Sequence, residues 1–188
     1  MENPQSNSSD RFLALLRPIE RELEVYCHRM IWETADVPDA IQNAVLQAFR
    51  AFDRYHDGTN FRAWMFKILT NEIFTLNRKR GRIRKFEVSA DLEEIESLTS
   101  LEQVCEYHEE LLSPNSLADA LDENLLLALK DLTETERAVL LLRAIADLRY
   151  REIGDSLDIP LGSVMGNLSR ARQKMRAAIM RQRRRTQL

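Results

Sequence analysis

The sequence has few of the residues that interrupt helices. Only 5 glycines and 5 prolines are spread over 188 residues, so the closely spaced turns of an all-β fold are missing. No apolar run approaches the ~20 residues that a membrane-spanning helix needs, and the polar residues 1–10 contain no apolar export signal. We therefore expect an all-α protein with a packed core, no membrane insertion and a cytoplasmic location.

Cysteine and histidine are equally scarce. The two cysteines, Cys27 and Cys105, lie far apart, as do the three histidines, which argues against a disulfide framework or a zinc site. The sequence also contains no P-loop, nucleophile elbow or dinucleotide-binding fingerprint. The acidic cluster at residues 93–96 lacks any accompanying ligand or catalytic residue. We expect no catalysis, no cofactor and no metal.

The small net charge of −3 conceals a strong segregation of charge. Residues 78–85 (RKRGRIRK) carry six basic side chains, residues 86–123 carry twelve acidic ones without a lysine or arginine, and residues 159–188 carry eight basic ones without an acid. Blocks of like charge give information about the binding partners of a protein rather than about its fold. The pattern predicts two basic surfaces separated by an acidic linker.

Helical periodicity organises the first half of the chain. An apolar stripe runs through residues 12–30, and Pro18 predicts a kink or a new helix start within it. A second helix is expected from Asp36, and residues 56–60 form the clearest loop. Asn60 then suits the N-cap of a third helix that runs from Phe61 to about Arg80. The apolar residues that share one face of the second helix are Ile41, Val45, Phe49 and Phe52.

The second half begins with the Ser-, Leu- and acid-rich stretch 87–123, in which residues 101–111 could form one short helix. Thr133 and Glu136 have the spacing of a capping box and start a helix that reaches Asp147. A short helix over 150–157, a turn over 158–160 and a long helix from about 161 follow. The expected domains are 10–85 and 120–180, joined by the acidic linker 86–119 and followed by a basic tail, 181–188.

Residues 149–172 have the pattern of a helix-turn-helix. Apolar residues point inward, and the second helix carries no acid, as expected of a helix that enters the major groove among phosphates. An ordinary helical hairpin with a solvated basic face is the alternative. Ser163, Asn167 and Arg170 share one side of that helix, where Arg suits guanine edges and Asn suits adenine edges. Lys174 lies later and suits phosphate.

Several segments resemble extracytoplasmic-function (ECF) sigma factors, and they occur in the same order along the chain as in that family. In the second half these are 132–139 (LTETERAV), 150–154 (YREIG) and 160–164 (PLGSV), followed by 170–172 (RAR). In the first half, 39–43 (DAIQN) with 48–52 (AFRAF) resembles the family's polymerase-binding helix. Residues 61–68 (FRAWMFKI), with Asn71 and 78–80 (RKR), resemble its minus-ten helix.

The resemblance implies a transcription initiation factor whose partners are core RNA polymerase and promoter DNA, with an anti-sigma factor as a further partner and a nucleoid-associated location. The polymerase-binding residues would be Asp39, Ile41, Gln42, Phe49 and Arg50. Those that bind the minus-ten element would be Asn60, Arg62, Trp64, Asn71, Arg78, Lys79 and Arg80. Those that bind the minus-thirty-five element would be Ser163, Met165, Asn167, Ser169, Arg170, Arg172 and Lys174.

The sequence also departs from the family pattern. Met165, Gly166 and Asn167 stand where a basic residue, a serine and an arginine are usual, which indicates a different upstream element. Asn43 replaces a common acid and Val45 a common aromatic. Two other functions therefore stay open: a sigma-like adaptor that sequesters an anti-sigma factor, and a plain helix-turn-helix regulator.

Overall fold

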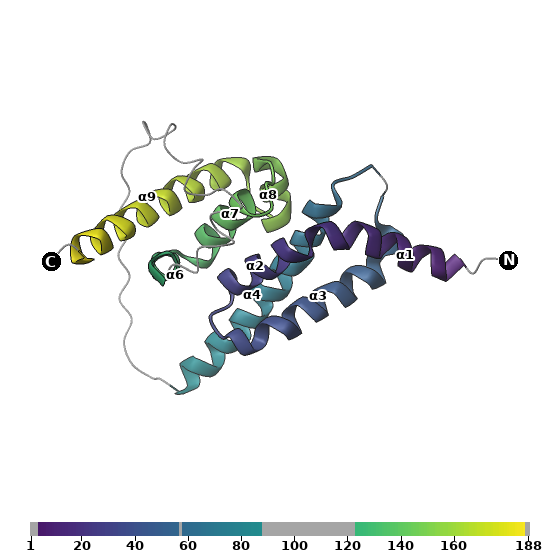
Figure 1. Cartoon of the computed structure of the whole chain (residues 1–188), viewed down its shortest axis with the longest axis horizontal. Helices are drawn as coiled ribbons and strands as arrows, with labels where there is room; N and C mark the ends of the chain where they lie inside the picture. Colours follow the sequence, from purple (N-terminus) through teal and green to yellow (C-terminus); the bar gives the residue numbers. More distant parts are fainter. Residues whose placement is uncertain (1–3, 57, 88–122, 187–188) are drawn as a thin grey trace.

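The computed structural model of the chain describes residues 4–56, 58–87 and 123–186. These residues form helices and their connections, and none of them lies in a strand. Figure 1 shows two groups of helices, α1–α4 from the first half of the chain and α6–α9 from the second. The predicted all-α, two-part fold is confirmed. The short helix expected at 101–111, with almost all of the acidic linker, lies outside the described residues.

The predicted break near Pro18 is confirmed as a short 3-10 turn. Helix α1 (Pro4–Leu16) ends there, the turn spans Arg17–Ile19, and α2 (Glu20–Met30) follows. The apolar stripe continues across the turn into the core, where Phe12, Leu16, Ile19, Leu23, Tyr26 and Met30 are all buried.

Helices α3 (Val37–Ala51) and α4 (Phe61–Glu87) pack against each other through small side chains on α3. The buried positions of α3 are Val37, Ala40, Ala44 and Ala48. Alanine allows two helix backbones to approach closely, so the larger residues of the predicted stripe are displaced to the edges of the contact. Of the predicted stripe, Phe52, which directly follows α3, is buried in the core, whereas Ile41 and Val45 are half-buried and Phe49 is exposed. Within α3 the stripe therefore does not mark the centre of the buried face.

The second group contains α6 (Glu123–Lys130), α7 (Glu134–Ala144), α8 (Tyr150–Leu157) and α9 (Leu161–Thr186). The capping box at the start of α7 is confirmed: Glu136 N donates to Thr133 Oγ1 (3.2 Å) and Thr133 N donates to Glu136 Oε2 (2.9 Å). Helix α7 ends at Ala144, before the predicted Asp147, which adopts a left-handed conformation (φ 48°). Helix α9 extends into the residues expected to form a tail.

The predicted helix-turn-helix is confirmed in α8 and α9. Asp158 ends α8 in the left-handed conformation (φ 54°), and Ile159 N donates to Gly154 O (3.0 Å) across the turn. A Cβ at Gly154 would lie 3.0 Å from Ile159 O. The absence of a side chain therefore permits the close approach of turn and helix.

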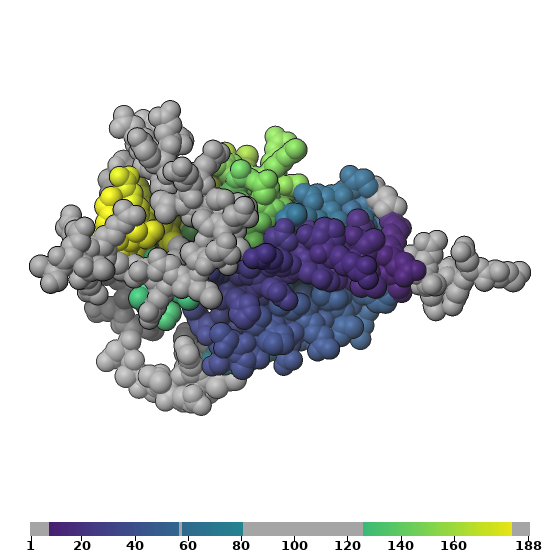
Figure 2. All heavy atoms as spheres, in the orientation of Figure 1, coloured from purple at the N-terminus to yellow at the C-terminus, as the bar shows by residue number. Residues whose placement is uncertain are grey.

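The two helix groups contact each other directly. Helix α8 packs along α4, and α7 packs along α2. In the space-filling view of Figure 2, the green surface of the second group adjoins the blue and purple surface of the first. This packing places parts of both predicted DNA-binding regions at one interface.

Candidate polymerase and nucleic-acid interfaces

The outer face of α3 carries most of the residues expected to bind polymerase. Asp39, Gln42, Phe49 and Arg50 are exposed, whereas Ile41 is half-buried against the core. Gln42 and Phe49 lie two turns apart and so face the same side. Phe49 is 43% exposed, yet its ring centroid lies 5.4 Å from that of buried Phe12 in an edge contact. Phe49 is therefore anchored by the core and presented to solvent.

Sequence reasoning missed Leu46 on this face. Leu46 is 45% exposed and lies between Gln42 and Phe49 in the i, i+3 and i+4 pattern of one helix side. The stripe assigned from sequence omitted it. Its spacing from Gln42 and Phe49 was the signal that could have found it.

The unusual Asn43 has a structural role in this fold. Asn43 Nδ2 donates to Glu72 Oε1 (3.3 Å), and Gln47 Nε2 donates to Glu72 Oε2 (2.7 Å). These bonds tie α3 to α4 next to the alanine contact. An amide at position 43 can donate to Glu72, whereas an acid there would repel it.

The loop before α4 is held by local hydrogen bonds. Thr59 Oγ1 donates to His56 O (2.7 Å), and Tyr55 Oη donates to Thr59 O (2.6 Å). Gly58 adopts a positive φ of 88°, a conformation that glycine takes without strain. The predicted N-cap is confirmed, because Ala63 N donates to Asn60 Oδ1 (3.3 Å). This geometry fixes the orientation of Asn60 at the start of α4.

Trp64 stands in an aromatic cluster beside this loop. Its ring centroid lies 5.3 Å from that of Tyr55 and 5.6 Å from that of Phe61. The side chain is half-buried, so part of the ring faces solvent. Trp64 therefore supports the core and also borders a surface on which a base could stack.

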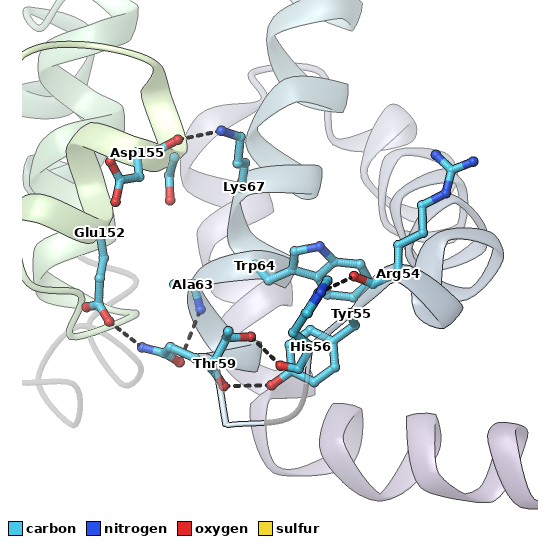
Figure 3. Close-up of a pocket in the computed structure, with 11 residues that line it drawn as sticks. Arg54, Tyr55, His56, Thr59, Ala63, Trp64, Lys67, Glu152 and Asp155 are labelled. Carbon is cyan, nitrogen blue, oxygen red and sulfur yellow. Dashed lines mark hydrogen bonds between the residues drawn. The ribbon is translucent and has the colours of Figure 1, made fainter.

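A cavity of about 450 Å³ opens between this cluster and α8. Figure 3 shows Tyr55, His56 and Trp64 on one side and Glu152 and Asp155 on the other. The loop and α4 belong to the first helix group and α8 to the second. The cavity therefore exists only while the two groups are packed together.

Hydrogen bonds at this interface involve Asn60, one of the predicted minus-ten residues, and Lys67. Asn60 Nδ2 donates to Glu152 Oε1 (2.8 Å), and Lys67 Nζ donates to Asp155 O (2.5 Å) and Asp158 Oδ1 (3.0 Å). Lys67 was not among the predicted site residues. A basic residue about one helical turn after Trp64 was the signal in the sequence that could have identified it.

The other predicted minus-ten residues are distributed along α4. Arg62 pairs with Glu22 (3.3 Å), and Arg80 pairs with Asp36. Arg78 donates to the carbonyl of Phe74, one turn before it in the same helix (3.3 Å). Asn71 and Lys79 are exposed. Since the helix rises ~1.5 Å per residue, Asn60 and Lys79 lie roughly 28 Å apart, and the predicted set forms a strip rather than one cluster.

In the second group, Glu136 is a buried carboxylate that organises basic side chains of α9. Lys174 Nζ donates to Glu136 Oε2 (2.7 Å), and Arg170 Nε lies 3.4 Å from Glu136 Oε1. Burial opposes ionisation of Glu136, but the hydrogen bonds from Lys174 and Thr133 outweigh it and hold the pKa of Glu136 below its ordinary value. Two of the predicted DNA-binding cations are thus engaged within the protein.

Helix α9 has one buried side and one exposed side. The buried side consists of Val164, Leu168, Ala171, Met175 and Ala178. Ser163, Met165 and Arg170 are exposed, while Asn167, Ser169, Arg172 and Lys174 are half-buried. Asn167 Nδ2 donates to Ser163 O (2.8 Å), and Arg170 Nη2 donates to Asn167 Oδ1 (3.0 Å). The predicted common side is confirmed for Asn167 and Arg170, whose side chains are in contact.

Within the described ranges, no helix is long and apolar enough to cross a membrane. The same ranges contain no group of three or more acidic, histidine or cysteine side chains placed to hold a metal ion.

The fold and these surfaces define an all-α protein with two helical parts, the second a helix-turn-helix with a basic helix. Models of two protein families match the chain: sigma-70 region 2 over residues 15–83 and sigma-70 region 4 over residues 122–175. The chain belongs to the sigma-70 family, in its ECF group.

Relatives of known name support this assignment. The chain is 31% identical to the ECF RNA polymerase sigma factor SigE of Mycolicibacterium smegmatis over 79% of its own length and 54% of the relative's. It is 25% identical to SigW of Bacillus subtilis, with 92% and 90% covered. The chain thus spans about half the length of some of these relatives, including SigG of Mycobacterium tuberculosis at 50%.

Two solved structures share the fold. One is the sigma factor RpoE in complex with the anti-sigma factor NepR from Bartonella quintana, with a TM-score of 0.66, 19% identity and coverage of 92% of this chain and 96% of that one. The other is CnrH in complex with the cytosolic domain of CnrY, with a TM-score of 0.59, 22% identity and coverage of 90% and 87%.

Proposed function

We propose that this protein is a transcription initiation factor that binds core RNA polymerase and directs it to specific promoters. One observation carries the proposal: both sigma-70 regions occur in one chain, and each has an exposed face suited to its partner. The function resides in binding surfaces, without catalysis by the chain itself. A cytoplasmic, nucleoid-associated location follows, because its partners lie there.

In this proposal α3 docks on polymerase through Asp39, Gln42, Phe49 and Arg50, with Leu46 added to the face. The exposed apolar area of Leu46 and Phe49 supplies the hydrophobic contact of such an interface, and the flanking polar residues supply its rim. Ile41 contributes by supporting the face from within.

The promoter would be bound at two places. The loop 56–60 and Trp64 offer a stacking surface for an unpaired base, and Lys67 with the exposed residues of α4 would meet the strand nearby. The first turns of α9 would enter the major groove of the upstream element, as the second helix of a helix-turn-helix does. In this proposal, the domain predicted at residues 10–85 binds polymerase and the minus-ten element, and the domain predicted at residues 120–180 binds the upstream element.

The test is reconstitution of the full chain with bacterial core RNA polymerase on a library of genomic promoters, followed by sequencing of the 5′ ends of the transcripts. We expect transcripts that start downstream of one shared two-part element and that disappear without the protein. Transcription unchanged by the protein would contradict the proposal.

A second candidate is an adaptor that sequesters an anti-sigma factor, and it is favoured by one structural neighbour, the sigma factor RpoE, which was solved in complex with the anti-sigma factor NepR. An adaptor would bind such a partner but would not form a complex with core polymerase. A plain helix-turn-helix regulator would have no use for the α3 face. Co-purification of the chain with core polymerase separates both alternatives from an initiation factor.

A further inference from the structure

The first turns of α9 expose two large apolar side chains. Leu161 is 39% exposed and Met165 is 49% exposed, and they lie one helical turn apart on the same side. Between them, Val164 turns into the core and is fully buried. Leu161 and Met165 therefore do not support the fold from within. They form an apolar surface at the N-terminal end of α9. In a helix-turn-helix protein, this end of the second helix contacts the base edges.

The polar side chains that could read bases are engaged elsewhere. Arg170 lies against the carboxylate of Glu136 (3.4 Å) and donates to Asn167 Oδ1 (3.0 Å). Asn167 in turn donates to the carbonyl of Ser163 (2.8 Å). To form a bidentate contact with a base, Arg170 or Asn167 would first have to give up these bonds. Leu161 and Met165 need no such rearrangement.

Two glycines, Gly162 and Gly166, leave the helix surface next to Leu161 and Met165 without side chains. A Cβ at Gly162 would meet nothing within 4 Å, so no packing contact inside the described part of the protein requires glycine there. At Gly166 a Cβ would lie 3.4 Å from Arg170 Nη1, so Gly166 leaves room for the side chain of Arg170 to fold back over the helix. Leu161 and Met165 consequently protrude beyond their neighbours.

We propose that Leu161 and Met165 recognise thymine in the upstream element through its 5-methyl group. Thymine presents an apolar 5-methyl group in the major groove, whereas the other three bases carry no methyl group there and are distinguished by their hydrogen-bond donors and acceptors. Residues 159–188 carry eight basic side chains and no acid, so α9 is attracted to duplex DNA rather than to an apolar protein surface. The inference rests on the proposed function and specifies how its upstream element is read.

The experiment first selects duplexes that bind the full chain from a randomised pool. Each thymine of the selected site is then replaced singly by deoxyuridine, which removes only the methyl group. We expect one or two positions at which this replacement weakens binding by the wild type about fourfold, the equivalent of the ~0.8 kcal/mol per buried methylene. Met165→Gln or Leu161→Ala should abolish the effect at one position each.

Controls separate readout from general affinity and from folding. Met165→Leu retains an apolar side chain and should keep the sensitivity to deoxyuridine. Met180→Ala removes a side chain of the same exposure (49%) from the far end of α9 and should also keep it. Circular dichroism verifies that each variant is folded.

Two results would overturn the inference. A selected site without deoxyuridine-sensitive thymines, or one whose sensitivity is the same in the wild type, Met165→Gln and Leu161→Ala, would refute methyl recognition and leave the proposed function standing. A selection that enriches no sequence would refute the inference together with upstream reading by α9. Polymerase co-purification then shows whether the remainder of the proposed function survives.

Discussion

Glu136 shows how one side chain couples stability to α9, the helix proposed to bind DNA. Its carboxylate is held by Thr133 at the start of α7 and by Lys174 of α9, and the pKa of Glu136 lies below its ordinary value despite burial. A group whose pKa is lower in the folded protein stabilises the fold at pH values above its unfolded pKa. That contribution is lost as the pH falls through the folded value.

We therefore predict that Glu136→Gln lowers the free energy of unfolding at pH 7 by about 1–3 kcal/mol, since it weakens charge-assisted hydrogen bonds. The difference from the wild type should shrink as the pH is lowered below about 4.3, the ordinary pKa of glutamate. Urea unfolding of both proteins at several pH values measures this. Glu24→Gln, on the exposed side of α2, is the control. A pH-independent difference would contradict the role of the charge.

At the same scale, Arg137 occupies an interface between the two helix groups. The residue is 5% exposed, and its Nε and Nη1 atoms are buried without a hydrogen-bond partner. Its guanidinium carbon lies 4.2 Å from the ring centroid of Trp32, a cation–π contact worth ~0.5–2 kcal/mol. Burial lowers the pKa of Arg137, which reflects the cost of desolvating this cation.

Because an apolar residue of similar volume avoids that cost, we predict that Arg137→Met leaves the free energy of unfolding within about 1 kcal/mol of the wild type. Trp32→Ala should lower it by about 1–2 kcal/mol, because it removes the ring from the cation. In the Arg137→Met background the loss from Trp32→Ala should be smaller. Additive losses in a double-mutant cycle would show that the two side chains do not interact.

At the scale of elements, α3 has separate inner and outer faces. Alanines fit the inner face to α4, while Gln42 and Phe49 remain on the outer face. If polymerase binds the outer face, Gln42→Ala combined with Phe49→Ala should reduce co-purification with core polymerase at least tenfold while circular dichroism shows unchanged helix content. Arg21→Ala with Glu24→Ala, both on the exposed side of α2, is the matched control. Normal assembly of the folded α3 variant would exclude this face.

The turn between α8 and α9 gives a second prediction at this scale. A Cβ at Gly154 would lie 3.0 Å from the backbone oxygen of Ile159, whereas one at Gly162 meets nothing within 4 Å. Gly154→Ala must therefore displace the turn and should cost about 1–3 kcal/mol. Gly162→Ala should be neutral or stabilising by up to ~1 kcal/mol, because alanine favours the helix. Thermal and urea unfolding compare the two, and equal effects would contradict the packing argument.

At the scale of the whole molecule, α8 covers part of the surface proposed to bind the promoter. Asn60 is bonded to Glu152, and Lys67 to Asp158 and the carbonyl of Asp155. While these bonds persist, acidic groups of α8 occupy the place that DNA would take. The two helix groups must separate at this contact before Asn60 and Lys67 can meet a strand.

We predict that Glu152→Ala combined with Asp158→Ala increases the affinity of the free protein for a single-stranded minus-ten oligonucleotide by about three- to tenfold, as expected for the loss of two exposed polar contacts. Fluorescence anisotropy at constant salt measures the affinity. Asp147→Ala combined with Glu24→Ala also removes two negative charges and controls for the change in net charge. Asp147 pairs with Arg143 (2.7 Å) outside this contact, and Glu24 is exposed on α2. An equal gain in the control would assign the effect to net charge alone.

Local sequence signals determined where the helices begin and end. Pro18, the capping box of Thr133 and Glu136, the N-cap at Asn60 and the turn before Pro160 each act within a few residues, so they can be recognised without a structure. The order of the two sigma-70 regions and the lack of acids in α9 are likewise properties of the linear chain, and they were sufficient to indicate the class of protein.

The tertiary structure alone decided which residues of these helices are available. Sequence periodicity favoured Ile41, Val45 and Phe49 as a common face, but the fit of α3 to α4 selected alanines for the core. The sequence predicts that Arg170 and Lys174 contact DNA, but in the structure both pair with Glu136, which lies more than 30 positions earlier in the chain. Asn60 and Lys67 meet α8 across about 90 positions. Such pairings depend on how the helices pack, and periodicity within one helix carries no information about them.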